Sequence, residues 1–395
     1  MDRGDRLVLR RLQLQNYRSY EAADLEFANP LYIVGLNASG KSNLADAMNF
    51  VSEAMREPLM TVLTRRGGFN EVRFRAGGRG RPPAMRLEFD LGSWGSMRSG
   101  HYSFELTAHS SYGFAVRSEA ARLSLGDGAT WYYTHQAGEA LQTNAEGIAP
   151  HVEPTTLLLP LVGGDARFAP MHDCLSRMVS YAIEPGLMRG AQDPDAADRL
   201  RPDGSNAAAV LQRRLLNHQP RSGALIEWLR PMIPDLVDIK PVQQGNRLVL
   251  TMVQRGASGL NITFDATVLS DGSLRALGLV LAATADPPPS VLVLEEPEAT
   301  IHPTALAVIR DLVHYAATHG QVVVTTHSTD LLDNRRIEAD NLRLVTWRDG
   351  RSTIVPVPAS AREALGSDLF SAGELLRAGQ LDPAADGPAP ALPQA

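Results

Sequence analysis

The eight residues Gly35-Leu36-Asn37-Ala38-Ser39-Gly40-Lys41-Ser42 fit the pattern G-x-x-x-x-G-K-[ST]. They follow an apolar run at 31–34 and precede a helical pattern over 43–57, which Pro58 ends. Glycines in such a loop let backbone N–H groups turn inward, and the start of the helix adds partial positive charge. The stretch therefore predicts a phosphate-binding loop between a strand and a helix.

The side chains of this loop have separate expected roles. Lys41 would reach the β- and γ-phosphates of a nucleotide, and the Ser42 hydroxyl would coordinate Mg²⁺. A chance glycine turn is the alternative, and the strand and helix on either side argue against it. The residues expected to contact ATP here are Gly35, Asn37, Ala38, Ser39, Gly40, Lys41, Ser42 and Asn43.

Paired carboxylates end a second apolar strand. Residues 291–294 are Val-Leu-Val-Leu, and Glu295-Glu296-Pro297-Glu298 follow them. Ligands of open α/β sheets bind at the carboxyl ends of the strands. Glu295 is therefore the expected outer ligand of Mg²⁺, and Glu296 is placed to polarise the attacking water. Such a pair alone is more often a solvated helix start, but its combination with the phosphate loop favours catalysis.

Two further segments gain meaning from these motifs. His327 follows the buried strand at 322–325, and a histidine delivered to that sheet edge can contact a γ-phosphate, although a lone strand-end histidine is usually structural. Ser270 and Gly272 precede an apolar helical run, so they lie at a helix N-terminus. A simple helix cap is the alternative for Ser270. Its position 25 residues before Glu295 favours a ligand-facing role.

Composition limits the function classes. The chain has 395 residues, enough for two to three domains, and a net charge of −6 excludes a globally basic nucleic-acid coat. The single cysteine, Cys174, cannot form an internal disulfide, and no secretory or membrane-spanning apolar run is present. These features predict a cytosolic protein. Only Lys41 and Lys240 are lysines, so 36 of the 38 basic residues are arginine, which coding bias explains.

Hydrophobic patterning predicts an α/β fold with a mixed or parallel sheet core, an antiparallel β lobe and a helical insertion. Alternating runs between 85 and 135 predict the antiparallel lobe, and strand-like alternation returns over 239–264. From Ser270 onward helix and buried strand alternate. The predicted segments are an N-terminal ATPase half at 1–150, the insertion at 151–238, a C-terminal ATPase half at 239–381 and a disordered tail at 382–395.

In their order, the phosphate loop, Leu269-Ser270-Asp271-Gly272, Glu295-Glu296 and Thr326-His327-Ser328 resemble the ABC-type ATPases of the SMC, RecF and OLD group. The match spans 7–333. Asn37 and Asn43, the early Asn16-Tyr17-Arg18-Ser19-Tyr20 and the segment at 295–303 look most like the OLD-type branch. The Asp-Gly signature and the Asn-flanked loop disfavour a transporter cassette. Ala38 departs from the glycine usual in the loop, and Thr300 from the histidine that OLD relatives often carry.

The resemblance implies a mechanism. ATP is bound between two heads, so Ser270 and Gly272 would act on ATP held by Lys41 and Ser42 of a second copy, with 299–302 lining the seam. ATP binding would close the homodimer and hydrolysis by Glu296 would open it. No glutamine loop stands out, and Gln136 and Gln142 are weak candidates.

Only 68 residues follow His327, too few for the Toprim nuclease domain of OLD nucleases. The first hypothesis is therefore an ATPase whose dimer gates a separately encoded effector, such as a Toprim-like nuclease, in DNA repair or anti-phage defence. The second is a nucleotide-regulated scaffold with negligible turnover.

Two surface segments each have two possible roles. The amphipathic segment 370–381 would dock on the core or on a partner, and an arginine-rich stretch at 65–81 is a solvated loop or a DNA-contacting strip. Its arginines are Arg65, Arg66, Arg73, Arg75, Arg79 and Arg81.

Overall fold

The computed structural model describes residues 6–75, 80–95, 97–126, 128–194, 199–217, 222–367 and 369–381. They form two compact units, which are described one at a time. Unit 1 contains the described residues up to Val179, together with 340–359 and Leu381, and unit 2 contains 180–339 and 360–380. These boundaries differ from the segment boundaries predicted at 150 and 238, which remain predictions, and the predicted tail at 382–395 lies outside the described residues.

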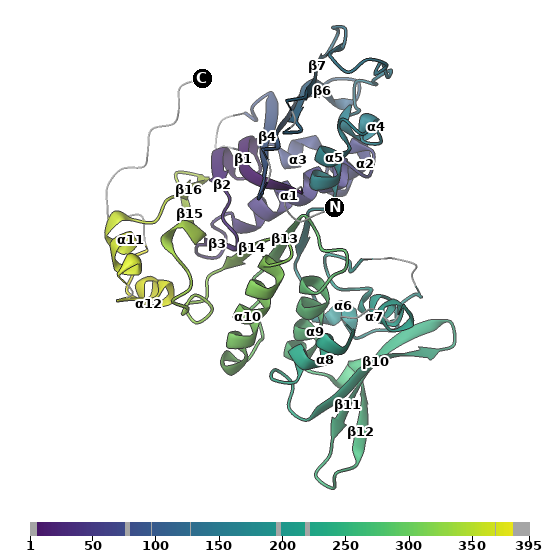
Figure 1. The fold of residues 1–395 in the computed structure, drawn as a ribbon, viewed down its shortest axis with the longest axis vertical. Coiled ribbons are helices and arrows are strands. Elements are labelled where there is room, and N and C mark those ends of the chain that lie inside the picture. Colours follow the sequence, from purple (N-terminus) through teal and green to yellow (C-terminus); the bar gives the residue numbers. More distant parts are fainter. Residues whose placement is uncertain are drawn as a thin grey trace. The chain divides into compact units, whose positions relative to one another are not determined.

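Unit 1 is built on a seven-stranded antiparallel sheet in the order β2-β1-β4-β5-β6-β7-β8. Figure 1 labels β1, β2, β4, β6 and β7 of this sheet. Buried and half-buried residues alternate strictly along β4, as expected for a sheet with one face on a core. The antiparallel lobe is continuous with the first strands, because β1 pairs directly with β4. The strands are β1 (Leu7–Tyr17), β2 (Tyr20–Glu26), β4 (Ala84–Ser93), β5 (Ser99–His109), β6 (Gly113–Ser124), β7 (Thr130–Gln136) and β8 (Gln142–Thr143).

A second group of strands in unit 1 carries the phosphate loop. Strand β3 (Leu31–Val34) is wholly buried and pairs in parallel with β15 (Leu342–Arg348), which pairs antiparallel with β16 (Arg351–Val355). Helix α1 (Lys41–Ala54) follows the loop, and its Phe50 ring lies 6.0 Å from that of Tyr17 and 6.3 Å from that of Phe104. These ring contacts fix the helix against the sheet. The other helices are α2 (Leu59–Arg65), α3 (Phe69–Val72), α4 (Leu159–Val162) and α5 (Ala169–Ser176).

Unit 2 contains a parallel strand pair and a separate small sheet. Strands β13 (Val291–Glu295) and β14 (Gln321–Thr326) pair in register from Val291 with Gln321 to Glu295 with Thr325. The pattern predicted over 239–264 forms a three-stranded antiparallel sheet of β10 (Leu236–Gln244), β11 (Arg247–Arg255) and β12 (Asn261–Asp265). Helix α9 (Asp271–Ala283) precedes β13 and α10 (Leu306–Ala317) precedes β14, as Figure 1 shows in green.

The remaining elements are short. The helical composition predicted after residue 150 forms brief helices separated by turns, because prolines recur along it. In unit 2 the short elements are β9 (Val179–Tyr181), α6 (Pro185–Met188), α7 (Ala207–Leu216), α8 (Ser222–Leu229), η2 (Ala266–Val268), η3 (Pro303–Ala305), α11 (Ala359–Gly366) and α12 (Ala372–Arg377). The first residues of β9 and α11, Val179 and Ala359, belong to unit 1. Among the described residues, none of the helices has the length and apolar character needed to span a bilayer.

Candidate nucleotide-binding site

The loop between β3 and α1 requires glycine at two positions. A Cβ on Gly35 would lie 2.3 Å from the backbone oxygen of Val345 and 2.8 Å from Ser39 Oγ. Gly40 has φ +114°, and a Cβ there would lie 2.2 Å from Ser352 Oγ. The first requirement is steric, and the second is both steric and conformational. The contacts of Val345 and Ser352 come from β15 and β16, strands that the sequence analysis did not predict.

Lys41 and Ser39 give the loop its polar interior. The buried Lys41 Nζ donates hydrogen bonds to the carbonyl oxygens of Gly35, at 2.8 Å, and Leu36, at 3.0 Å. Ser39 is 3% exposed, and its Oγ has no hydrogen-bond partner within the described residues. Ser42 lies exposed in the first turn of α1, and no side chain of the described residues caps that helix start. A buried unpartnered hydroxyl and an uncapped helix N-terminus suit an anionic phosphate.

A network of hydrogen bonds joins the phosphate loop to the β1–β2 hairpin and to β16. Ser19, in the turn between β1 and β2, accepts a hydrogen bond from Asn43 Nδ2 at 2.7 Å and another from Ser352 Oγ at 2.7 Å. The Ser352 hydroxyl also lies 2.6 Å from the Ser39 carbonyl oxygen, and Tyr20 donates to the Gly40 carbonyl at 3.0 Å. The segment Asn16–Tyr20, noted in the sequence for its resemblance, is thus a support of the phosphate loop.

Asp46 in α1 collects three donors from neighbouring elements. Its carboxylate accepts hydrogen bonds from the Tyr17 hydroxyl and from Arg18 Nε, both at 2.6 Å, and from Arg66 Nε at 2.9 Å. Burial, and then the Asp46 charge, raise the pKa of Tyr17, so its phenol remains a donor. This cluster ties the β1–β2 hairpin to the helix that follows the phosphate loop.

Four arginines of the arginine-rich stretch contact acids or carbonyl oxygens within unit 1. Arg65 pairs with Glu53 and Glu57, and Arg66 pairs with Asp46 and Glu53. Arg81 pairs with Glu71, while the buried Arg73 donates to the Pro82 carbonyl at 2.6 Å; Arg79 lies outside the described residues. The geometry therefore favours a structural role for these side chains over a strip that contacts DNA. The acids Asp46, Glu53 and Glu57 belong to the preceding helix and the turn after it, so they lie outside the stretch at 65–81.

In unit 2, the two predicted carboxylates lie at the end of β13 in different settings. Glu295 Oε1 accepts a hydrogen bond from Ser180 Oγ at 2.8 Å, and Ser180 is buried in β9. Glu296 has φ +42°, a left-handed conformation that is unusual for this residue type. Its backbone N–H donates to the Thr325 carbonyl at 2.9 Å. Ser180 stands 115 positions before Glu295, so no local pattern could have revealed it.

The side chains of Glu296 and His327 contact each other. Both residues were predicted to lie at the ends of buried strands on one sheet edge. His327 Nδ1 lies 3.2 Å from Glu296 Oε1. His327 follows β14 and Glu296 follows β13, and the parallel register of these strands brings the two side chains together. A carboxylate beside an imidazole can hold the ring in one orientation and, in turn, have its own orientation fixed.

The predicted signature begins α9. Ser270 is its N-cap, since its hydroxyl accepts a hydrogen bond from the Ser273 backbone N–H at 3.2 Å. The cap alternative for Ser270 is thus realised within the chain, and the residue remains exposed. A Cβ on Gly272 would lie 2.7 Å from the Thr300 carbonyl oxygen, which places the signature directly against the turn at 299–302. Arg189 contacts both Asp271 and the Leu269 carbonyl and holds this helix start.

The predicted site residues divide between the units. Those of the phosphate loop belong to unit 1, and Ser270, Gly272, Glu295, Glu296 and His327 belong to unit 2. Gln136 and Gln142 lie on β7 and β8, at the opposite end of the unit 1 sheet from the β1–β2 hairpin that braces the loop. This position does not support either glutamine as a nucleotide contact.

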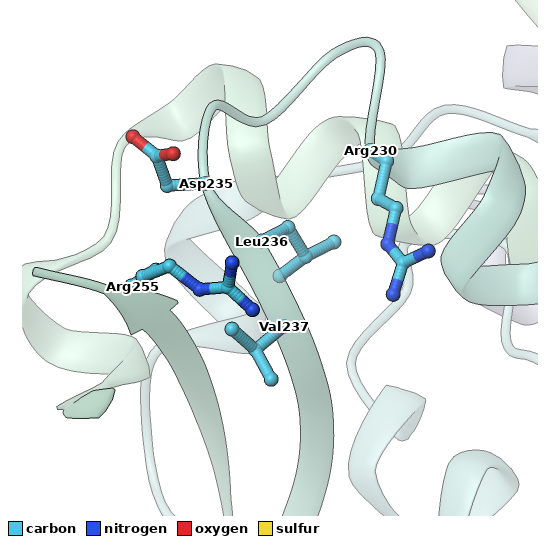
Figure 2. A pocket seen from close by; sticks show the side chains of 5 residues that line it. All are labelled: Arg230, Asp235, Leu236, Val237 and Arg255. Carbon is cyan, nitrogen blue, oxygen red and sulfur yellow. The ribbon is translucent and has the colours of Figure 1, made fainter. Parts of the chain in front are cut away.

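A surface hollow in unit 2 contains none of the predicted site residues. It has a volume of about 330 Å³ and lies at the start of β10. Figure 2 shows the guanidinium groups of Arg230 and Arg255 pointing toward the space beside Leu236 and Val237, while the Asp235 carboxylate points away.

Two family models match separate parts of the chain. Residues 183–333 match an AAA domain described as "putative AbiEii toxin, Type IV TA system", and residues 11–110 match an AAA domain. The first segment holds the signature, the paired carboxylates and His327, and the second holds the phosphate loop. AAA-type ATPase domain models therefore match both of the segments that carry the predicted site residues.

Two solved structures of SMC heads match most of the chain. One, the SmcHead bound to the C-winged helix domain of ScpA, has a TM-score of 0.52 at 14% identity and covers 90% of this chain and 99% of that one. The fold is that of an SMC-type ATPase head. The other, the Smc head domain with an extended coiled coil bound to the C-terminal domain of ScpA from Pyrococcus furiosus, has a TM-score of 0.53 at 12% identity and covers 92% and 99%. At such identities the likeness to SMC heads concerns the fold alone. No curated protein matches the chain.

Proposed function

We propose that the chain is an ATPase of the ABC type, closest to the OLD branch, that binds ATP through its phosphate loop and hydrolyses it with Glu296. The observation that carries the proposal is the loop, in which a buried lysine and a buried unpartnered serine hydroxyl lie at an uncapped helix start. Phosphoryl transfer depends mainly on positioning and on stabilising charge. The contact between Glu296 and His327 supplies a carboxylate for the attacking water and an imidazole for the γ-phosphate.

The residues also suit magnesium. Ser42 and Glu295 would hold Mg²⁺, and both offer the oxygen donors that this hard cation prefers. The Ser180 hydroxyl fixes one oxygen of Glu295 from within β9, as residues behind a metal ligand commonly do. When bound with nucleotide, Mg²⁺ supplies positive charge that neutralises the phosphate oxygens.

We further propose that two copies of the chain share their nucleotides. Ser270 and Gly272 of one copy would face ATP held by Lys41 and Ser42 of the other, and the turn at 299–302 would lie at the seam. The exposure of Ser270 and the contact of Gly272 with the Thr300 carbonyl support this, because they place the signature and the turn on one accessible surface of unit 2. ATP would close the dimer and hydrolysis would open it.

The closing and opening of this dimer would gate a separately encoded effector in DNA repair or anti-phage defence, a Toprim-like nuclease being the proposed type. The SMC heads of similar fold were solved with domains of ScpA bound, which supports a head that works with another protein. Direct contact with DNA is not part of the proposal, because the arginine-rich stretch is engaged in ion pairs and carbonyl contacts.

The test is steady-state ATP hydrolysis by the wild-type chain, Lys41→Ala and Glu296→Gln. We expect Lys41→Ala to abolish hydrolysis. Glu296→Gln should lower kcat by about 10²–10⁴-fold, the usual contribution of a general base, while ATP still binds. Glu363→Gln, which removes an exposed carboxylate in α11, is the control and should match the wild type. Equal, near-zero rates for the wild type and Glu296→Gln would favour a nucleotide-regulated scaffold, and full activity of Lys41→Ala would contradict the assignment of the loop.

A further inference from the structure

Glu298 is a buried carboxylate outside the roles assigned above. It is 9% exposed, and its Oε1 accepts a hydrogen bond from Thr326 Oγ1. Its Oε2 is also buried and has no hydrogen-bond partner within the described residues. Burial raises the pKa of this carboxyl group. A buried polar oxygen without a partner costs free energy, which an apolar residue at the same place would avoid. The position is therefore poorly explained by packing alone.

Thr326 links Glu298 to the turn that carries His327. It is the last residue of β14, has no exposed surface and immediately precedes His327. Its hydroxyl donates to Glu298 and accepts a hydrogen bond from the Ser328 backbone N–H at 2.9 Å. One buried hydroxyl thus fixes the backbone on both sides of His327. Because threonine is branched at Cβ, its χ1 angle is restricted, and the direction of the hydroxyl is set with it.

The contact between His327 and Glu296 needs such support. Their side chains are 45% and 37% exposed, and a pair this exposed to water contributes little stabilisation of its own. The buried elements under the two residues must therefore set their separation. Glu296 is held through its backbone N–H by Thr325, and His327 is held by the Glu298–Thr326–Ser328 chain of hydrogen bonds.

We propose that Glu298 is a positioning residue of the ATPase site: through Thr326 it holds the turn of His327 at the distance that lets His327 contact Glu296. The inference rests on the proposed function, because it assigns Glu298 a part in the reaction of Glu296 and His327. Glu298 itself need not touch the nucleotide.

The test uses Thr326→Val, which keeps the shape but removes the hydroxyl, and Thr326→Ser, which keeps the hydroxyl. We expect Thr326→Val to lower kcat about tenfold or more, because a small misplacement of a reacting group is costly, with KM for ATP within about twofold. Thr326→Ser should stay near the wild type. Glu298→Ala should behave like Thr326→Val, and Glu298→Gln, which keeps an acceptor for Thr326, should lose less.

A double-mutant cycle separates positioning from general damage. In a His327→Ala background, Thr326→Val should cause no further loss, because residues that act through one another are not additive. The same loss of kcat in both backgrounds, or a wild-type kcat for Thr326→Val, would overturn the inference.

A second readout does not depend on hydrolysis. The imidazole cross-peaks of His327, in a proton–nitrogen spectrum of the nucleotide-free protein, should shift in Thr326→Val and not in Thr326→Ser. Unchanged cross-peaks in Thr326→Val would overturn the positioning role even if the wild type hydrolyses ATP. Shifted cross-peaks in a chain that does not hydrolyse ATP would contradict the proposed function and leave the link from Thr326 to His327 supported. Matching thermal melts would show that the variants fold.

Discussion

Most of the described non-glycine residues with a positive φ angle lie in or beside the predicted motifs. Seven of the described non-glycine residues have positive φ. Asn16 and Arg18 lie at the hairpin that braces the phosphate loop, and Ala38 lies in the loop itself, at φ +61°. Glu296 is itself a predicted catalytic residue, and Thr300 lies in the turn against the predicted signature. Strained conformations of this kind persist where surrounding contacts impose them, and they are common at functional sites.

Ala38 offers a direct test of this strain. In relatives of the resembled group a glycine is usual at this position, and glycine adopts φ +61° without the clash that a Cβ causes. We expect Ala38→Gly to stabilise the fold by about 0.5–1 kcal/mol, the relief of strain less the added entropy of the unfolded chain. Urea unfolding measures the change.

The control for Ala38→Gly is Ala364→Gly in α11, where glycine should destabilise by up to about 1 kcal/mol because it weakens a helix. A destabilised Ala38→Gly variant would show that the loop does not hold Ala38 in a strained conformation.

At the scale of elements, the phosphate loop depends on its neighbours in unit 1. Strand β15 stands 2.3 Å from where a Cβ of Gly35 would lie, and β16 supplies Ser352 against Gly40. The β1–β2 hairpin adds Ser19 and Tyr20. The loop is therefore enclosed by strands from both ends of the chain.

Gly40→Ala should disrupt the packing of the phosphate loop against β16. A Cβ at φ +114° is strained, and it would overlap Ser352 Oγ at 2.2 Å. We expect a loss of about 1–3 kcal/mol in the free energy of unfolding, the usual cost of such strain, together with loss of ATP binding. Calorimetry and a fluorescent nucleotide measure the two effects.

Gly164→Ala is the matched control for Gly40→Ala, because nothing lies within 4 Å of a Cβ at Gly164 and its φ is not positive. Normal ATP binding by Gly40→Ala would show that the observed loop geometry is not the one that binds nucleotide.

At the scale of the whole molecule, the predicted site residues belong to two units. The phosphate loop lies in unit 1, whereas the signature, the paired carboxylates and His327 lie in unit 2. In the proposed dimer, ATP held by the phosphate loop of one chain would also contact the signature of the other, so its binding energy would depend on the association of the two chains. Such coupling is what a switch requires, since a ligand shifts an equilibrium only through its different affinity for the two states.

Ser270→Arg tests the shared site. We expect it to abolish ATP-driven dimerisation while monomer nucleotide binding remains, because the added guanidinium would fill the surface that faces the partner's nucleotide. Ser270→Ala is the control, since it also loses the helix cap, at a cost of about 1 kcal/mol, but adds no bulk. Analytical ultracentrifugation with ATP, in a Glu296→Gln background that slows hydrolysis, gives the assembly state. Intact dimers of Ser270→Arg would count against action on the partner's nucleotide.

The phosphate loop with its flanking strand and helix, the antiparallel strands, and the placement of Glu296 and His327 at the ends of buried strands were predictable from the sequence, whereas the contact between these two side chains came from the pairing of β13 with β14. Each predictable feature depends on neighbours within a few positions or on the period of a buried strand, and these are written locally. The roles of all the predicted site residues, Lys41, Glu296 and His327 included, stay predictions. The partners of the site residues were not predictable: Ser180 meets Glu295 across 115 positions, and Ser352 meets Ser19 across 333.

The amino-acid sequence by itself thus determined the prediction of phosphate binding, because a phosphate loop is built from contiguous backbone. Only the tertiary structure decided which buried hydroxyls contact the predicted site segments: Ser352 lies against Gly40, and Thr326 accepts a hydrogen bond from the Ser328 backbone N–H next to His327. Such contacts depend on how distant strands pair, and hydrogen bonds between side chains far apart in the chain leave no periodic trace in the sequence.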